Sequence, residues 1–155
     1  MKITIIAAGK IQERFIEEGL SLYLKRLKHY ASVNIIEVQG AKGLKEPEKL
    51  KISESNALLE KVPEGARIIL LDERGDLLSS TDFAAMIEKN QVNSVKNLVF
   101  LIGGSYGFSE ECYKKASGML SLGRMTFPHQ LLRLIFAEQL YRAYTILKGE
   151  NYHHS

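Results

Sequence analysis

Short apolar segments alternate with longer amphipathic segments along the chain, and this alternation limits the fold more than any other feature. The apolar segments end at Gly, Pro or polar residues, which is typical of strands. Apolar residues occupy successive positions in most of them, as in strands covered on both faces. We therefore predict an α/β fold, a mainly parallel sheet flanked by helices. The predicted strands are Lys2–Ala8, Val33–Val38, Arg67–Leu71, Leu98–Ile102 and Met119–Leu122.

The segments between these strands have the features of helices. Ser109 precedes two glutamates, as at a capped helix start, where acids favour the helix dipole. Pro128 is expected to open the last helix, and Gly149 follows its end. The first two predicted helices span residues 11–30 and 48–62. A third is capped by Ser80 or Thr81 and reaches about Asn90, a short fourth begins after Ser109, and the last runs from Pro128 to about Lys148.

Length and composition indicate one domain that needs neither disulfides nor a structural metal for its stability. The 155 residues suit a single domain, 1–155, and no repeat or linker divides them. Cys112 is the only cysteine, so we expect a buried free thiol, no disulfide and no metal site. The apolar start is too short for a signal peptide, and no run approaches the roughly 20 residues that span a bilayer. We therefore expect a cytoplasmic protein that does not enter membranes.

Positive charge is concentrated toward the C-terminus. The formal net charge of the chain is +3, which excludes a polycation that binds nucleic acid indiscriminately. The segment from Tyr113 onward contains six Lys and Arg residues and two Glu residues, so its formal net charge is +4. Charge alone fits an RNA-binding face and a chance distribution equally well.

Three segments follow predicted strands, where ligands bind in parallel sheets. The first two are Leu71–Gly75 and Gly103–Phe108, which contains Gly103, Gly104 and Gly107. The glycine spacing matches neither a dinucleotide fingerprint nor a P-loop, so the turn either lets backbone groups approach a ligand or is simply tight. The third segment, Leu122–His129, offers backbone groups and apolar side chains to an adenine edge, or is merely a buried loop.

The last predicted helix is apolar almost all round, so we expect a second subunit to cover part of it. Glu138 and Arg142 are spaced for an ion pair, which serves either a substrate or a dimer interface. His129 and Arg133 have the same spacing on roughly the opposite face. Beyond this helix, Tyr152 and His153 suit base stacking and proton transfer, although a loose chain end is the alternative reading.

Taken together, six motifs closely resemble the RlmH family, the SPOUT-class methyltransferases of 23S ribosomal RNA that act on N3 of pseudouridine 1915 in helix 69. The resemblance covers the whole chain, and the ordered set of motifs is specific even though each one is weak. The motifs are Leu70–Gly75, Leu101–Gly107, Leu120–Leu122, Met125–Gln130, Glu138–Ala143 and Tyr152–His153.

The resemblance implies a SPOUT fold with a C-terminal trefoil knot at roughly 98–155, a homodimer, and S-adenosylmethionine as cofactor. It also implies that the substrate is the assembled ribosome and that the tail of one subunit lies near the cofactor of the other. Asp72, Glu73 and Arg74 sit where family members vary, so no role is assigned to their side chains. The implied cofactor contacts are Leu71, Gly103, Gly104, Leu122, Gly123, Arg124, Met125, Thr126 and Phe127.

A mechanism follows as a hypothesis. The N3 proton needs an acceptor, for which His153 is the candidate, with Tyr152 stacking on the base. Arg133 and Arg142 would hold phosphate or negative charge on the uracil carbonyls, Glu138 would orient Arg142, and His129 would help to position the substrate. The alternatives are a non-catalytic RNA- or ribosome-binding factor and an enzyme that uses another nucleotide, such as a flavodoxin-like protein.

Overall fold

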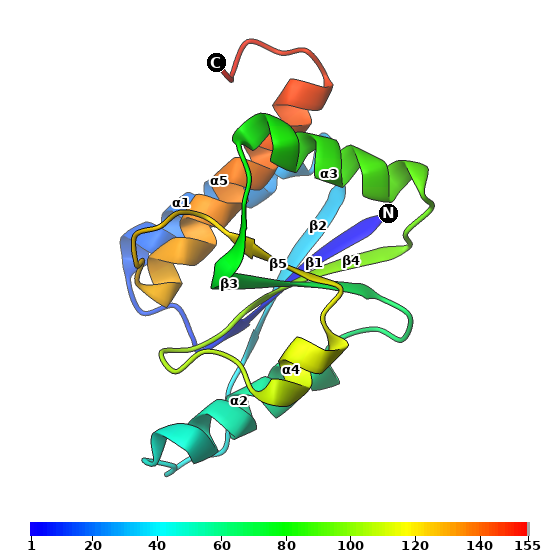
Figure 1. Ribbon diagram of the computed structural model, residues 1–155. Helices are drawn as coiled ribbons and strands as arrows, with labels where there is room; N and C mark the ends of the chain where they lie inside the picture. Colours follow the sequence, from blue (N-terminus) through cyan, green and yellow to red (C-terminus); the bar gives the residue numbers. More distant parts are fainter. Residues whose placement is uncertain (155) are drawn as a thin grey trace.

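The computed structural model describes residues 1–154 and shows a five-stranded sheet with helices on both faces (Figure 1). The strand order is β2-β1-β4-β3-β5, and every pair of neighbouring strands is parallel. The predicted α/β class is therefore confirmed. The strands are β1 (Lys2–Ala8), β2 (Ser32–Val38), β3 (Arg67–Leu77), β4 (Asn97–Ile102) and β5 (Gly118–Ser121). The helices are α1 (Arg14–Leu27), α2 (Pro47–Glu60), α3 (Ser80–Val92), α4 (Glu110–Lys115) and α5 (His129–Leu147).

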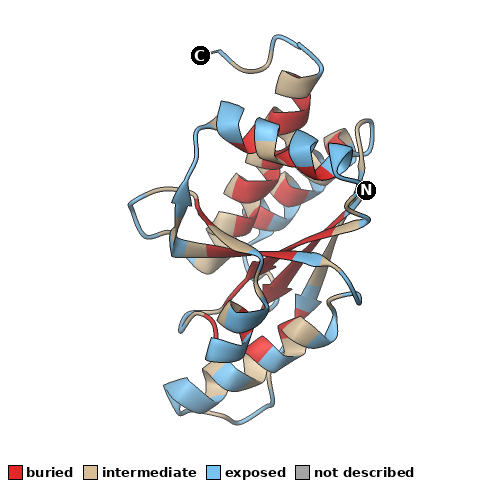
Figure 2. Cartoon of the chain, turned by 45° about the vertical axis from the view of Figure 1, so that its right-hand side comes forward, coloured by how far each residue is buried: buried red, intermediate tan, exposed pale blue. Residues whose placement is uncertain are grey.

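The helices divide between the two faces of the sheet (Figure 1). Helix α5 packs between α1 and α3 on one face, and α2 contacts α4 on the other. Successive residues of β1 enter different cores because side chains alternate across a strand. Ile3 and Ile5 lie in the core under α5 with Phe136, whereas Ile6 packs with Leu58 of α2 on the other side. Figure 2 shows the resulting buried layers along the strands and the inner faces of the helices.

Several element boundaries differ from the sequence prediction by one to three residues. Helix α3 is capped by Ser79, not by Ser80 or Thr81, because the extended Ser79 accepts a hydrogen bond from the Asp82 N–H at 3.0 Å. Pro128 stands at the N-cap of α5 rather than inside it. Ser109 caps α4 as predicted, and its Oγ accepts from the Cys112 N–H. Cys112 is a buried free thiol, also as predicted.

Strand β3 is longer than predicted and continues through the charged segment 72–77. It pairs with β5 twice, first through Leu71 and then, after a register shift, through Asp76. A Cβ atom at Gly75 would lie 2.5 Å from the backbone nitrogen of Leu120, so only glycine allows β3 and β5 to cross this closely. The sequence lacked a strand signal here because 72–77 is polar and mostly exposed.

No helix within residues 1–154 is both long enough and apolar enough to cross a membrane.

Candidate functional site

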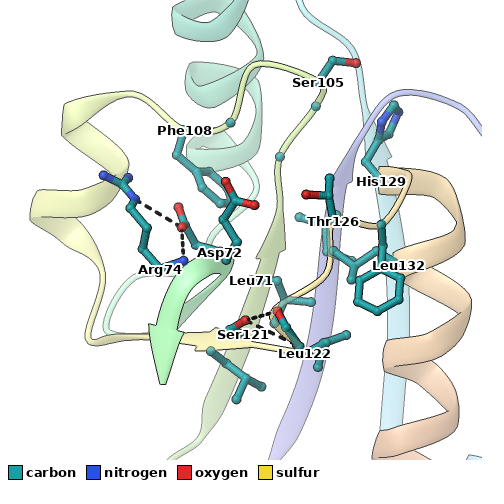
Figure 3. A pocket seen from close by; sticks show the side chains of 18 of the residues that line it. Leu71, Asp72, Arg74, Ser105, Phe108, Ser121, Leu122, Thr126, His129 and Leu132 are labelled. Carbon is teal, nitrogen blue, oxygen red and sulfur yellow. Dashed lines mark hydrogen bonds and ion pairs between the residues drawn. The ribbon is translucent and has the colours of Figure 1, made fainter. Parts of the chain in front are cut away.

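A cavity of about 410 Å³ opens where the buried part of β3 ends at Leu71 and at the carboxyl ends of β4 and β5. Its size falls in the range of small-ligand sites, roughly 300–1,000 Å³. Its walls are the segment after Leu71, the Gly-rich turn after β4 and the loop after β5, as Figure 3 shows. These are the three segments that the sequence places at the ligand-binding edge of the sheet, and the structure brings them together around one hollow.

The Gly-rich turn contributes the backbone of Gly103, Gly104 and Gly107 to the wall of the cavity. The Gly107 N–H donates to the Gly104 carbonyl at 3.1 Å, and Gly107 has a φ of +80°. A Cβ atom at Gly103 would lie 3.1 Å from the Gly107 oxygen, and one at Gly104 would lie 2.7 Å from Glu54 Oε1. The turn is therefore tight for structural reasons, and the same lack of side chains leaves its backbone open to the cavity.

The loop after β5 supplies the opposite wall. Ser121 Oγ donates to the Gly123 carbonyl at 2.8 Å and accepts from the Gly123 N–H at 3.3 Å, which fixes the turn (Figure 3). Eight of the nine residues expected to contact a cofactor line the cavity, and only Arg124 does not. The eight are Leu71, Gly103, Gly104, Leu122, Gly123, Met125, Thr126 and Phe127.

A carboxylate that the sequence analysis left without a role also lines this cavity. Asp72 accepts hydrogen bonds from the Tyr113 hydroxyl and from the Arg74 N–H, the latter at 2.8 Å. Burial alone would raise the pKa of Asp72, but these hydrogen bonds and the adjacent guanidinium outweigh burial and lower that pKa. The carboxylate therefore stays ionised at neutral pH. Its position at the carboxyl end of a buried strand was the signal that could have identified it.

His129 lines the cavity from the first residue of α5 (Figure 3). Burial and the positive charge of Arg133 lower its pKa, so the imidazole is neutral at pH 7. A neutral imidazole can both donate and accept a hydrogen bond.

Arg133 does not line the cavity. The side chain is fully buried, with Nη1 3.0 Å from Glu37 Oε2 and Nη2 donating to the Ala8 carbonyl at 2.7 Å. Burial lowers the pKa of Arg133, although the Glu37 carboxylate opposes this effect. The guanidinium has no exposed surface in this chain and joins α5 to β1 and β2, so its contact with phosphate stays a prediction.

The other four candidates form one hydrogen-bonded group, here called the tail network: Glu138, Arg142, Tyr152 and His153. Arg142 Nη2 lies 2.6 Å from Glu138 Oε1, and the Tyr152 hydroxyl donates to the same oxygen at 3.0 Å. The Arg142 guanidinium lies 4.7 Å from the Tyr152 ring centroid and 3.2 Å, through Nη1, from His153 Nδ1. Tyr152 and His153 are therefore held against α5.

Gln139, which lies inside the Glu138–Ala143 motif, and two residues outside the motifs, Ser80 and Tyr30, hold this network in place. Gln139 Nε2 donates to Glu138 Oε2 at 2.9 Å, and its Oε1 accepts from Ser80 Oγ at 2.7 Å. The Tyr30 hydroxyl donates to Glu150 at 2.7 Å, two residues before Tyr152. These contacts link positions 59 and 120 residues apart, so periodicity along the sequence could not reveal them.

The tail network and the cavity lie at different ends of α5. Glu138 follows His129 by nine residues, which corresponds to about 13 Å along a helix that rises 1.5 Å per residue. None of the four network residues lines the cavity. Within residues 1–154, no three His, Cys, Asp or Glu side chains come together as metal ligands would.

The structure is a parallel α/β sheet with a ligand-sized cavity between residues 71–74 of β3 and the loops that follow β4 and β5. Solved structures with a similar fold superpose on it. A probable methylase family protein from Haemophilus influenzae superposes with a TM-score of 0.52 at 12% identity, covering 99% of this chain and 70% of that one. A probable rRNA methyltransferase from Porphyromonas gingivalis gives 0.51 at 15% identity, over 94% and 69%. At such low identities these likenesses show the fold alone.

Sequence relatives identify the family. Residues 1–153 match the family model described as "Predicted SPOUT methyltransferase". Relatives named ribosomal RNA large subunit methyltransferase H are 45% identical in Carboxydothermus hydrogenoformans, over 99% of both chains, and 43% identical in Cytophaga hutchinsonii, over 99% of this chain and all of that one. The chain therefore belongs to the SPOUT methyltransferase family and, within it, to the RlmH family.

Proposed function

We propose that this protein uses S-adenosylmethionine to methylate N3 of pseudouridine 1915 in helix 69 of 23S ribosomal RNA, acting in the cytoplasm on the assembled ribosome. The observation that carries the proposal is that eight of the nine expected cofactor contacts line one cavity. The names of the relatives, which are ribosomal RNA methyltransferases, support the class of substrate. The trefoil knot at 98–155 stays a prediction.

The cavity fits this cofactor in size and in chemistry. The bare backbone of Gly103 and Gly104 allows a close approach, and Leu122 and Phe127 provide apolar surface for an adenosine. The bound cofactor would supply an electrophilic methyl group on its sulfonium. What the protein adds is position, because an in-line displacement depends on the alignment of donor and acceptor.

The tail network would act on the uracil ring. A guanidinium has only donors, so His153 Nδ1 must accept from Arg142, which leaves the proton of a neutral imidazole on Nε2. His153 can therefore accept the N3 proton at Nδ1 only after Arg142 releases that nitrogen. The negative charge that develops on the uracil carbonyls is a stronger partner for Arg142 than a neutral imidazole is. Substrate would thus free the base when it is needed, while Glu138 keeps Arg142 in place.

A second copy of the chain completes the site in this proposal. The network lies more than a helix turn away from the cavity of its own chain, so the tail of one subunit would serve the cavity of its partner. Mixing two inactive variants tests this arrangement. A dimer that joins a Thr126→Trp subunit, in which the indole would fill the cavity, to a subunit truncated after Asn151 keeps one complete site of two, and random exchange should restore about a quarter of wild-type activity. Sites confined to one chain would give none.

Mass spectrometry of 23S ribosomal RNA tests the function itself. Purified protein with S-adenosylmethionine should add one methyl group to the pseudouridine of ribosomes from cells that lack the protein. Truncation after Asn151 should abolish methylation but preserve cofactor affinity, whereas truncation after His153 is the matched control and should preserve both. Ribosome binding without methyl transfer, and without measurable affinity for S-adenosylmethionine, would instead establish the non-catalytic binding factor.

A further inference from the structure

All the formal charge that lines the cavity lies in one short segment. Asp72, Glu73 and Arg74 are consecutive residues of β3, and together they form what we call the charged wall. Figure 3 shows Asp72 and Arg74 across the cavity from Thr126 and His129. His129 is neutral at pH 7, and the remaining lining residues carry no charge. The cavity therefore has one charged side and one uncharged side.

The proposed cofactor is divided in the same way. Its adenosine is uncharged, whereas its amino-acid end carries an ammonium and a carboxylate beside the sulfonium, with a net charge of +1. The charged wall has two carboxylates and one guanidinium, which gives −1. The ammonium and the carboxylate at one end of the ligand are therefore complementary to the carboxylates and the guanidinium on one side of the cavity.

We propose that the charged wall is the subsite for the amino-acid end of the cofactor, with Asp72 accepting from the α-ammonium and Arg74 donating to the α-carboxylate. This inference rests on the proposed use of S-adenosylmethionine. It also fixes the direction of the ligand, because the adenosine must then lie against the uncharged loop that holds Leu122 and Phe127.

The structure prepares both side chains for these contacts. Asp72 is 9% exposed, and its Oδ2 accepts from the Tyr113 hydroxyl. Its Oδ1 accepts from the Arg74 backbone N–H and also pairs with Arg74 Nε at 3.4 Å, so the free acceptor position for a ligand is on Oδ2, while the two Nη groups of Arg74 are not used by Asp72. A carboxylate oxygen accepts more than one hydrogen bond, so Asp72 keeps room for an ammonium. The Arg74 guanidinium lies 4.7 Å from the Tyr113 ring centroid, a contact that limits its orientation. The side chain is 67% exposed, so the guanidinium is still accessible to a ligand.

Two ligands that differ only at the amino-acid end test the subsite without any catalytic turnover. S-adenosylhomocysteine has that end and a neutral sulfur, whereas 5′-methylthioadenosine has the neutral sulfur alone. We expect titration calorimetry to show that Asp72→Asn and Arg74→Ala each weaken S-adenosylhomocysteine about tenfold, the usual effect of one charge-assisted hydrogen bond. Both variants should bind 5′-methylthioadenosine within about twofold of wild type.

Arg67→Ala is the matched control, because Arg67 is an exposed arginine at the other end of β3. It should change the affinity for neither ligand. Equal weakening of both ligands by Asp72→Asn and Arg74→Ala, or no weakening, overturns the subsite while the cofactor proposal stands. Failure of the wild-type protein to bind any of these adenosine compounds would instead contradict the proposed function. Because Arg74 is exposed, Arg74→Ala keeps the test valid even if Asp72→Asn impairs folding.

Discussion

Arg133 and Glu37 form a buried ion pair whose two members should respond differently to substitution. Arg133 is fully buried and contacts Glu37 at 3.0 Å and the Ala8 carbonyl at 2.7 Å. Glu37 is 37% exposed and also accepts from the Ile11 N–H at 2.8 Å. Removing Glu37 leaves a buried guanidinium without its anion, whereas removing Arg133 removes the buried charge itself.

The magnitudes follow from these contacts. Breaking a buried pair from one side typically costs roughly 3–5 kcal/mol, and the partial hydration of Glu37 lowers our expectation for Glu37→Leu to about 2–3 kcal/mol. Arg133→Met relieves the desolvation of a charge but leaves the Ala8 carbonyl unpaired, at a cost of about 1–3 kcal/mol, so the net change should stay within about 1 kcal/mol. Glu37→Gln keeps an acceptor and should cost about 1 kcal/mol.

Urea unfolding at one fixed protein concentration measures these differences, since the stability of an oligomer depends on concentration. The methylation rate of the same samples tests whether Arg133 has a structural role only, in which case Arg133→Met stays active. A loss of stability in Arg133→Met as large as that in Glu37→Leu would refute the energetic reasoning. Normal stability with lost methylation would show that Arg133 contacts the substrate.

Three further predictions concern the cavity and the strands around it. Gly104→Ala should weaken cofactor binding by no more than about threefold in calorimetry, because the new Cβ would lie 2.7 Å from the Glu54 carboxylate, which is the end of a flexible side chain and can move aside. Gly75→Ala should lower the thermal midpoint far more than Gly118→Ala, since the first Cβ would meet backbone at 2.5 Å and the second a side-chain methyl at 3.4 Å; equal effects would contradict the crossing of β3 and β5. The lowered pKa of His129 means that the unfolded chain binds its proton first as pH falls below about 6.5, so acid should reduce stability, and His129→Gln should flatten that slope in urea unfolding between pH 7 and 5.

Periodicity was sufficient to predict the sheet and its helices but not the interactions between distant residues. The apolar run of β4 and the capping serine of α4 have local causes, so the sequence predicts them correctly. The continuation of β3 beyond Leu71 depends on pairing with β5 at the sheet edge, where charged residues remain exposed. Local composition at 72–77 therefore pointed to a loop, and tertiary pairing made it a strand.

The residues that line the cavity follow from the positions of strand ends in the sequence, whereas the burial of Arg133 does not follow from any local pattern. Gly103, Gly104 and the loop 122–127 follow strand ends, and strand ends meet at one edge of a parallel sheet. Arg133 was expected at the substrate because it lies in the basic C-terminal third of the chain. Its actual partner, Glu37, lies 96 residues away, and no local signal connects the two.

Helix α5 carries two groups of functional candidates that point in opposite directions. At 3.6 residues per turn, the nine residues from His129 to Glu138 amount to two and a half turns, so their side chains leave opposite sides of the helix. Arg133, between them, is fixed to β1 and β2, which prevents the helix from rotating to bring Glu138 toward its own cavity. In the dimer proposed above, the tail network of one subunit would lie at the cavity of its partner. We therefore expect any substitution that separates the subunits to abolish methylation while each separated chain still binds the cofactor.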